Sequence, residues 1–189
     1  MKLLDLEVVT PSAVQIVTVA EYTDHARLNG LTVDAQPDLI ARQIAAASSR
    51  AEQYLRRSLL EQTIKAVFLP EQGDFSTVPL LRLPRGPVKS VTSVTSGGQP
   101  VTGYTLQWNV ITLNAALSAA AEVVYVSAGF GDEAADVPQP VREGILEYAT
   151  TLYEDRTGAR DAKHEASAGR RLPAGVEDLW RPFQIELSG

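Results

Sequence analysis

The last third of the chain, from Gly129 to Phe183, limits the possible folds more than any other segment. It opens with an acidic turn that ends at Pro138 and continues into a run whose apolar residues recur every three or four positions. That spacing predicts an amphipathic helix packed on a core. The polar stretch 157–171 has no such period, and a short aromatic segment, 172–183, follows it. We therefore expect a helix, a flexible loop and a terminal segment suited to holding a partner.

Two earlier segments also carry helical signals. Thr18 and Glu21 match the capping box of a helix start, which predicts a helix over 19–28. Apolar residues at helical spacing predict a longer helix over 38–57. The alanines of this second helix would allow close packing against a neighbour, within the chain or in another copy. The amphipathic run of the last third adds a third helix over 138–156.

The middle of the chain, 60–128, is β in character. Short runs rich in β-branched and aromatic residues alternate with turn signals at Gly97-Gly98 and Asn109. Six strands are expected, over 60–69, 78–83, 88–95, 104–108, 110–113 and 122–128. Residues 1–17 read as an extended leader. The predicted fold is α+β: a bundle of two or three main helices with an antiparallel sheet or small sandwich inserted in it.

One domain over 1–156 and a C-terminal arm over 157–189, comprising the flexible loop and a docking segment, follow from these elements. Composition removes several classes of function. The chain has no cysteine, so disulfides and thiolate sites are excluded, and its two histidines share no ligand spacing. A net charge of −6 argues against a protein that grips nucleic acid by neutralising phosphates. No apolar run approaches the roughly 18 residues of a membrane span, so no membrane contact is expected.

Three patterns could carry chemistry, and each has a structural alternative. The Gly129-Phe-Gly131 segment lacks the spacing of phosphate-binding loops and fits a turn that closes a strand. The acids at Asp132, Glu133 and Asp136 could hold a cation or could favour the positive end of the following helix. His25 stands near acids but without a nucleophile motif. We therefore predict no catalytic, cofactor-binding or metal-binding residues.

The aromatic tail and the basic doublets suggest binding instead. Trp180 and Phe183 flank Arg181, and these residue types are the usual anchors of protein interfaces. The same aromatics could equally strap the tail onto the chain's own core. The doublets Arg56-Arg57 and Arg170-Arg171 could meet phosphates or the acidic groups of a partner protein. Because two isolated doublets do not make a basic stripe, a protein partner is favoured.

Several short motifs recur in one order along most of the chain, from about Val17 to Phe183. They are TVAEYTDHARL (18–28), DLIARQIAAA (38–47), AEQYLRR (51–57), LEQT (60–63), LPRGPV (83–88), SVTSV (90–94), YVSAGFG (125–131), VREGI (141–145) and LYEDR (152–156). In order and spacing they resemble the head–tail connector (adaptor) family of tailed bacteriophages and related gene-transfer particles. The β region is long for a minimal helical adaptor.

The resemblance implies a structural role without catalysis or cofactors. Such adaptors form a ring of about twelve copies below the portal protein of a DNA-filled capsid. The ring extends the DNA channel and supports the downstream tail-completion (stopper) protein, while double-stranded DNA passes without specific binding. The implied location is the virion, at the head–tail junction, after assembly in the bacterial cytoplasm. The alternative is a nucleic-acid-binding accessory protein of DNA packaging, which would need its basic residues gathered on one surface.

The resemblance also assigns residues to the two interfaces. The C-terminal segment would dock on the portal through Arg170, Arg171, Leu172, Leu179, Trp180, Arg181 and Phe183. The second and third helices would make subunit contacts through Ile44, Ala47, Ala51, Tyr54, Tyr148 and Leu152. A hydrolase that uses Asp132 and Asp136 is a further alternative, which would require a pocket where these carboxylates converge.

Overall fold

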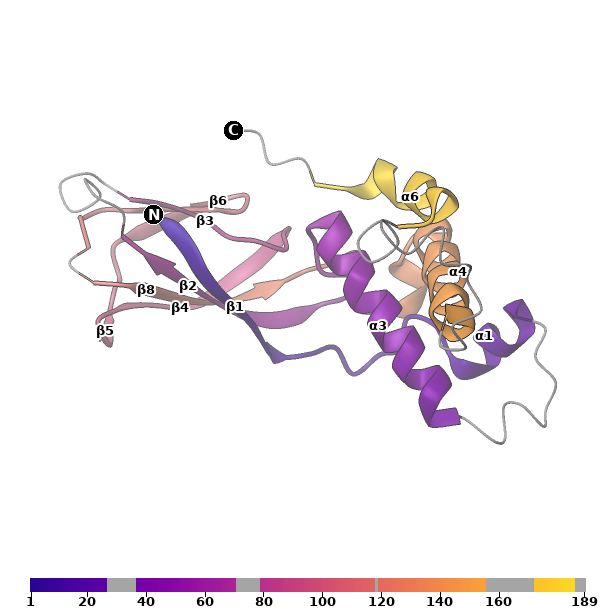
Figure 1. Cartoon of the computed structure of the whole chain (residues 1–189). Helices are drawn as coiled ribbons and strands as arrows, with labels where there is room; N and C mark the ends of the chain where they lie inside the picture. The colour runs from indigo at the N-terminus through magenta and orange to yellow at the C-terminus, as the bar shows by residue number, and fades with distance from the viewer. Residues whose placement is uncertain (27–36, 71–78, 118, 156–171, 186–189) are drawn as a thin grey trace. The chain divides into compact units, whose positions relative to one another are not determined.

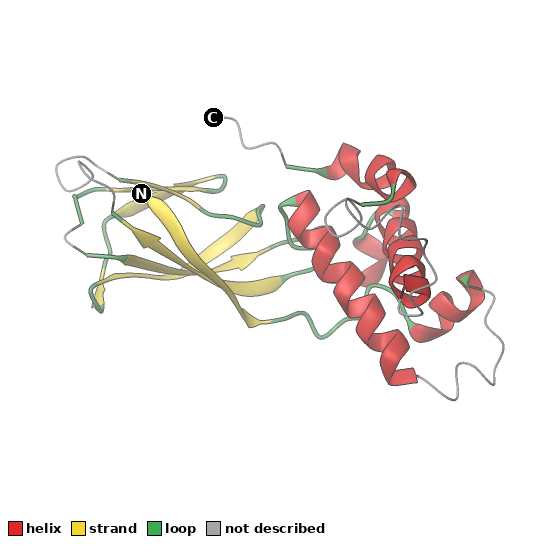
Figure 2. Ribbon diagram, viewed as in Figure 1, coloured by secondary structure: helices red, strands yellow, loops and turns green. Residues whose placement is uncertain are grey.

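A computed structural model describes residues 1–26, 37–70, 79–117, 119–155 and 172–185 (Figure 1). The chain forms two compact units, each assembled from segments distant in sequence. The β unit comprises 1–14 and 56–132, and the helical unit comprises 15–55 and 133–189. Strands gather in the first unit and helices in the second, so the predicted α+β class is confirmed (Figure 2).

The described part of the helical unit contains four α-helices and two short 3₁₀ turns. The helices are α1 (Val19–His25), α3 (Pro37–Leu55), α4 (Gln139–Asp155) and α6 (Ala174–Trp180). The 3₁₀ turns are η1 (Ala134–Asp136) and η2 (Arg181–Phe183). The three predicted helices are therefore present, and the aromatic tail forms a fourth.

The capping box predicted at the start of α1 is confirmed. The Thr18 hydroxyl accepts a hydrogen bond from the Glu21 backbone N–H at 3.2 Å, and the Glu21 carboxylate accepts one from the Thr18 N–H at 2.7 Å. The predicted end at residue 28 is wrong, because α1 stops at His25. Ala26 is the C-cap, and its N–H donates to the Tyr22 carbonyl at 2.9 Å. The last two residues of the predicted range, 27 and 28, lie outside the described residues.

Packing of α3 against α4 forms the core of the helical unit. The buried residues of α3 recur every three or four positions: Ile40, Ile44, Ala47, Ala51 and Leu55. From α4 the buried residues include Val141, Ile145 and Ala149. This is the pattern that predicted both helices, and each apolar stripe faces the interior as expected.

The β unit contains two antiparallel sheets. One has the order β1-β2-β8-β4-β5 and the other β3-β7-β6. Their strands are β1 (Lys2–Thr10), β2 (Gln62–Leu69), β3 (Leu80–Arg82), β4 (Val88–Ser96), β5 (Gln99–Pro100), β6 (Tyr104–Gln107), β7 (Val110–Leu113) and β8 (Ala121–Ser127). One buried cluster takes residues from both sheets, among them Ile64, Phe68, Leu81, Ile111, Val123 and Tyr125. The small sandwich predicted for 60–128 is confirmed.

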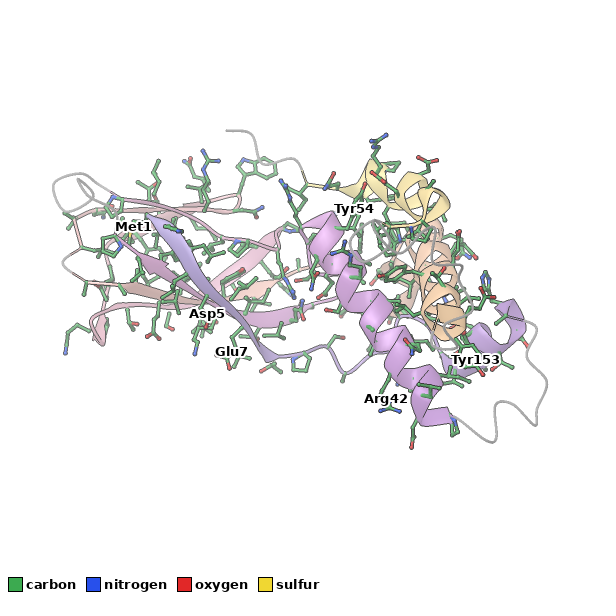
Figure 3. The ribbon with its side chains drawn as sticks, in the orientation of Figure 1. Met1, Asp5, Glu7, Arg42, Tyr54 and Tyr153 are labelled. Carbon is green, nitrogen blue, oxygen red and sulfur yellow. The ribbon has the colours of Figure 1, made fainter. Side chains whose placement is uncertain are left out.

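The first residues form a strand that the sequence did not predict. β1 pairs antiparallel with β2, and Met1 and Leu6 pack against the core of the sandwich (Figure 3 labels Met1). The register with β2 shifts at Leu4 and at Val9, so each of these residues is one more than the partner strand supplies. Their side chains are 61% and 50% exposed. These two bulges interrupt the strict alternation by which a strand is recognised in a sequence. The segment therefore reads as an irregular extended leader.

Loop contacts explain the glycines that follow β8. Gly129 has φ of +60°, and a Cβ there would lie 2.7 Å from the backbone carbon of Leu60. The Phe130 N–H donates to the Leu59 carbonyl at 3.0 Å, and the Glu61 N–H donates to the Gly131 carbonyl at 2.9 Å. Gly129 therefore lets two backbone segments pack closely at the end of a strand, which is the structural alternative to a phosphate loop.

Candidate assembly surfaces

The C-terminal segment 172–185 packs onto the helical unit through one tryptophan. α6 lies against α4 (Figure 1). The Trp180 side chain is fully buried, and its indole N–H donates to the Val141 carbonyl at 3.2 Å. Gly144 makes room for the ring, because a Cβ at that position would lie 2.3 Å from the indole nitrogen. A glycine inside a helix normally weakens it, so this one has a packing reason.

Tyrosine rings surround the same indole. The centroids of Tyr54 and Tyr148 lie 6.0 and 6.2 Å from that of Trp180, within the range of favourable aromatic pairs. Tyr54 lies on α3 and Tyr148 on α4, so Trp180 links both helices. The Tyr54 hydroxyl donates to the Glu177 carboxylate at 3.4 Å. Burial, and then the negative charge of Glu177, raise the pKa of Tyr54, which keeps the hydroxyl protonated as a donor.

The residues after α6 complete the end of α3. The last carbonyls of an α-helix have no partner within the helix. The Gln184 side-chain amide donates to the Tyr54 carbonyl at 2.9 Å, and the Ile185 N–H donates to the Leu55 carbonyl at 3.0 Å. Figure 3 shows Tyr54 at this end of α3. The segment 172–185 is therefore part of the helical unit and supplies one of its helix caps.

The residues assigned to portal docking differ in accessibility. Trp180 and Leu172 are buried, Leu179 and Phe183 are half-buried, and the Arg181 side chain is 71% exposed. Arg170 and Arg171, like the loop 157–171, lie outside the described residues. Of the two alternatives for Trp180, its buried position corresponds to a contact with the chain's own core. We call the segment 172–185, which Trp180 holds on the helical unit, the C-terminal strap. The surface that this strap presents consists of its half-buried apolar residues and Arg181.

The residues assigned to subunit contacts divide in the same way. Ile44, Ala47 and Ala51 are buried within the helical unit, whereas Tyr54, Tyr148 and Leu152 are half-buried. Ala41, Ala45 and Ala46 of α3 are exposed. The alanine-rich helix thus uses part of its alanines for internal packing and leaves the others at the surface.

Ionic contacts join α1 to α4. Arg142 forms an ion pair with Glu21, and His25 lies 3.9 Å from the Glu143 carboxylate. The hydrogen bond from the Thr18 backbone is the main cause that lowers the pKa of Glu21, and Arg142 contributes to the same direction. His25 and the helix acids therefore take part in contacts between helices.

The acidic turn before α4 acts as a local cap. The Asp136 carboxylate accepts a hydrogen bond from the Glu133 N–H at 3.0 Å and so fixes the 3₁₀ turn η1. Over the described ranges, no three His, Asp or Glu side chains lie together in a way that could hold a metal ion. In the same ranges, no helix is both long and apolar enough to cross a membrane.

The Arg56-Arg57 doublet does not present two cations side by side for binding. The Arg57 guanidinium lies 3.8 Å from the centre of the Phe130 ring and donates to the Gly129 carbonyl at 2.8 Å. Burial lowers the pKa of Arg57. Arg57 therefore stabilises the loop after β8, while Arg56 is exposed in a left-handed conformation just after α3.

Trp108 is the surface feature that the sequence analysis missed. The tight turn predicted at Asn109 is confirmed, and Trp108 is the other residue of that turn between β6 and β7. Its side chain is 91% exposed. The only sequence signal was its setting between the polar Gln107 and Asn109, since an aromatic residue inside a polar turn has few neighbours to cover it.

Comparison with known proteins identifies the fold. A scan against protein-family models and a search of the curated proteins give no match. Among solved structures, the chain is similar to one from the neck of an empty gene transfer agent (GTA) particle computed with C6 symmetry, with a TM-score of 0.69 and 22% identity. It is also similar to chains from the neck of a native GTA particle computed with C12 symmetry (TM-score 0.67, 21% identity) and from the virion of a native GTA particle (0.68, 20%). Each match covers 98% of both chains, so the chain has the fold of a GTA neck protein.

Proposed function

We propose that this chain is a structural adaptor at the head–tail junction of a tailed phage or phage-like particle such as a gene transfer agent. The observation that carries the proposal is the fold similarity to GTA neck chains over 98% of both chains, with no large insertion or missing unit on either side. An adaptor acts by binding, and its work is assembly rather than catalysis. The chain would be assembled in the bacterial cytoplasm and retained in the virion.

The proposed assembly is a ring of about twelve copies, because the similar neck was computed with C12 as well as C6 symmetry. A ring of identical subunits needs a contact between two different faces that closes on itself. The exposed alanines Ala41, Ala45 and Ala46, and the half-buried Tyr54, Tyr148 and Leu152, are candidates for that contact. Small side chains allow two backbones to approach closely.

The portal contact is proposed for the outer surface of the C-terminal strap. Trp180 holds α6 on the helical unit, and the strap presents Leu179, Arg181 and Phe183. Aromatic, aliphatic and arginine side chains on a rigid support are typical of binding hot spots, because little conformational entropy is lost on association. The preceding residues Arg170 and Arg171 would add positive charge to the same docking segment.

The ring would surround DNA without binding it tightly. The net charge of the chain is −6, so the subunit as a whole repels phosphates. Release of counterions from the DNA would therefore add little affinity. On its tail side the ring would support a tail-completion protein. A packaging protein that binds nucleic acid would instead show strong DNA binding that falls steeply with salt.

The test is the mass of the complex that the chain forms with portal rings of the same particle. Light scattering on the purified chain alone, and then on its mixture with portal rings, measures both association and copy number. We expect a complex with about twelve chains per portal ring. Failure to associate at any salt concentration, combined with salt-sensitive binding to double-stranded DNA, would replace the adaptor by the packaging protein.

A substitution in the strap tests the portal surface separately. Arg181→Glu should weaken binding to the portal ring by at least about tenfold, as expected for a hot-spot charge. It also replaces an exposed ion pair with Glu177 at 3.9 Å, so stability should fall by no more than about 1 kcal/mol. Arg42→Glu is the matched control, since Arg42 is an exposed arginine on α3 (Figure 3). Equal portal binding by both variants would move the portal contact away from the strap and leave the adaptor function in place.

A further inference from the structure

The exposed Trp108 side chain occupies a turn that favours smaller residues. Its φ is +55°, in the left-handed region that bulky residues rarely adopt, and 91% of its surface is exposed. Burial of a large aromatic side chain would normally offset the free-energy cost of such a backbone conformation. The described residues of the chain do not bury Trp108. Single exposed apolar side chains are common on protein surfaces. The combination of an exposed aromatic ring with an unfavourable backbone conformation is what makes Trp108 a candidate contact with another molecule.

The turn is held rigidly by its second residue. The Asn109 side-chain carbonyl accepts a hydrogen bond from the Val88 N–H at 3.0 Å, and its backbone carbonyl accepts one from the Leu83 N–H at 2.7 Å. The Asn109 amide fills the space beside Gly86, where a Cβ would lie 2.0 Å from the amide nitrogen. Because β3 also pairs with β7, the turn is fixed on two sides, so the backbone that carries Trp108 has little freedom to lose on binding.

Two arginines lie beside this turn. Between Asp74 and Glu122 the sequence has three bases and no acid. Arg82 lies opposite Val110 in the register of β3 and β7, next to the turn, and Arg85 precedes Gly86. The third base, Lys89, pairs with the Glu61 carboxylate at 2.5 Å, so we do not count it toward the turn. We call the turn with these flanking arginines the Trp108 turn.

The chain carries its negative charge elsewhere. The sequence of the β unit has seven acids and seven bases, whereas that of the helical unit has sixteen acids and ten bases. The helical unit therefore supplies the whole net charge of −6. The basic Trp108 turn of one molecule and the acidic helical unit of another are complementary in charge, which would steer and orient their association.

We propose that the Trp108 turn docks on the helical unit of a second copy of this chain and forms part of the contact that closes the ring. This proposal rests on the proposed function. The contact joins two different surfaces, so each copy can offer its turn to one neighbour and receive the turn of the other. Trp108 acts as the anchor, and the flanking arginines set its orientation.

Charge favours a second copy over DNA as the occupant. A turn flanked by two arginines can neutralise few phosphates, and the affinity of a protein for duplex DNA depends on that number. A tryptophan can also enter a duplex only by unstacking base pairs, which would hinder DNA that must pass through the neck. DNA is nevertheless a distinct outcome of the experiment below.

The direct test places the photo-crosslinker p-benzoylphenylalanine at position 108 in cells that produce the particle. Purified particles are irradiated, and products that contain the chain are sized and digested. A nuclease-resistant adduct of twice the mass of the chain, with the crosslink to a peptide of the helical unit, is the expected result. An adduct with another protein, a nuclease-sensitive adduct, or no adduct in particles that contain the chain would overturn the proposal. A chain that is absent from the particles would instead contradict the proposed function.

A second measurement does not depend on the crosslinker. Trp108→Ala should weaken self-association of the chain, on portal rings or alone, by at least about tenfold, and added salt should weaken it further. Leu80→Ala is the control, because Leu80 is 54% exposed on β3 of the same small sheet. Both variants should melt at the wild-type temperature. Equal self-association of Trp108→Ala and Leu80→Ala would overturn the assignment.

Discussion

The helical unit and the β unit contain one tryptophan each and use it in opposite ways. Trp180 is enclosed by α3, α4 and α6, with its indole N–H bonded to a backbone carbonyl. Trp108 stands almost fully exposed on a two-residue turn of the sandwich. Both positions depend on a glycine that leaves space nearby, Gly144 for the indole of Trp180 and Gly86 for the amide of Asn109.

This difference shows that an aromatic residue is not informative by its type alone. The sequence left Trp180 open between an interface anchor and a contact with the chain's own core, and the resemblance to the connector family assigned it to portal docking. The structure instead gives Trp180 the contacts of a core residue, which makes the strap a rigid support for its outer side chains. The accessible tryptophan was predicted as the last residue of the strand over 104–108, whereas β6 ends at Gln107 and Trp108 belongs to the turn.

The largest expected effect comes from removing Trp180. Trp180→Ala should lower the free energy of unfolding by about 3–5 kcal/mol, because it removes a fully buried ring and leaves a cavity between three helices. Trp108→Ala should change it by less than about 0.5 kcal/mol, as for other exposed positions. Urea denaturation followed by circular dichroism measures both. Wild-type stability of Trp180→Ala would show that the strap does not dock in solution.

A smaller effect is expected at Gly144. Gly144→Ala should destabilise the chain by about 1–3 kcal/mol, because the added methyl group displaces the indole ring. Gly175→Ala is the matched control within α6, where the new methyl group would meet only the flexible end of Glu147 at 3.0 Å. The thermal unfolding of both variants checks this. If Gly144→Ala instead stabilised the chain, as alanine does in an unobstructed helix, the packing reason for this glycine would be lost.

The smallest effect concerns the start of α1 and depends on pH. Thr18→Ala should cost about 1 kcal/mol at neutral pH by removing the cap. The pKa of Glu21 is lowered in the folded chain, so its contribution is complete above its usual value of 4.5 and is lost as the pH falls below that value. Without the cap hydroxyl, the loss of stability between neutral pH and pH below 4.5 should be smaller than in the wild type.

Thr23→Ala provides the reference for this experiment. Its hydroxyl donates to the Val19 carbonyl within α1 and does not contact Glu21. Stability measured by urea denaturation at several pH values should therefore follow the wild-type pH dependence in Thr23→Ala. An identical pH dependence in Thr18→Ala would mean that the Thr18 hydroxyl does not contribute to the lowered pKa of Glu21, which would then depend on the Thr18 backbone N–H and Arg142.

Local patterns in the sequence determined most of the secondary structure. The buried stripes of α3 and α4 repeat at the period of the helix, and the strands β2, β3, β4, β6, β7 and β8 were located within one or two residues. The two-residue strand β5 (Gln99–Pro100) was not predicted, because it is too short to show an alternation. The capping box at Thr18 and the turns at Gly97 and Asn109 were also correct, because each depends on residues only a few positions apart. The same logic explains the failure at β1, whose bulges at Leu4 and Val9 break the alternation.

Only the tertiary structure decided which surfaces are available for assembly. The chain crosses between two units three times, at residues 14–15, 55–56 and 132–133, and each unit combines segments more than forty residues apart. The burial of Trp180 depends on α3, α4 and Gly144, and the display of Trp108 depends on a turn held by Leu83 and Val88. These partners are distant in sequence, and no local period relates them. The sequence therefore determined the elements, whereas packing between distant segments determined which side chains remain outside.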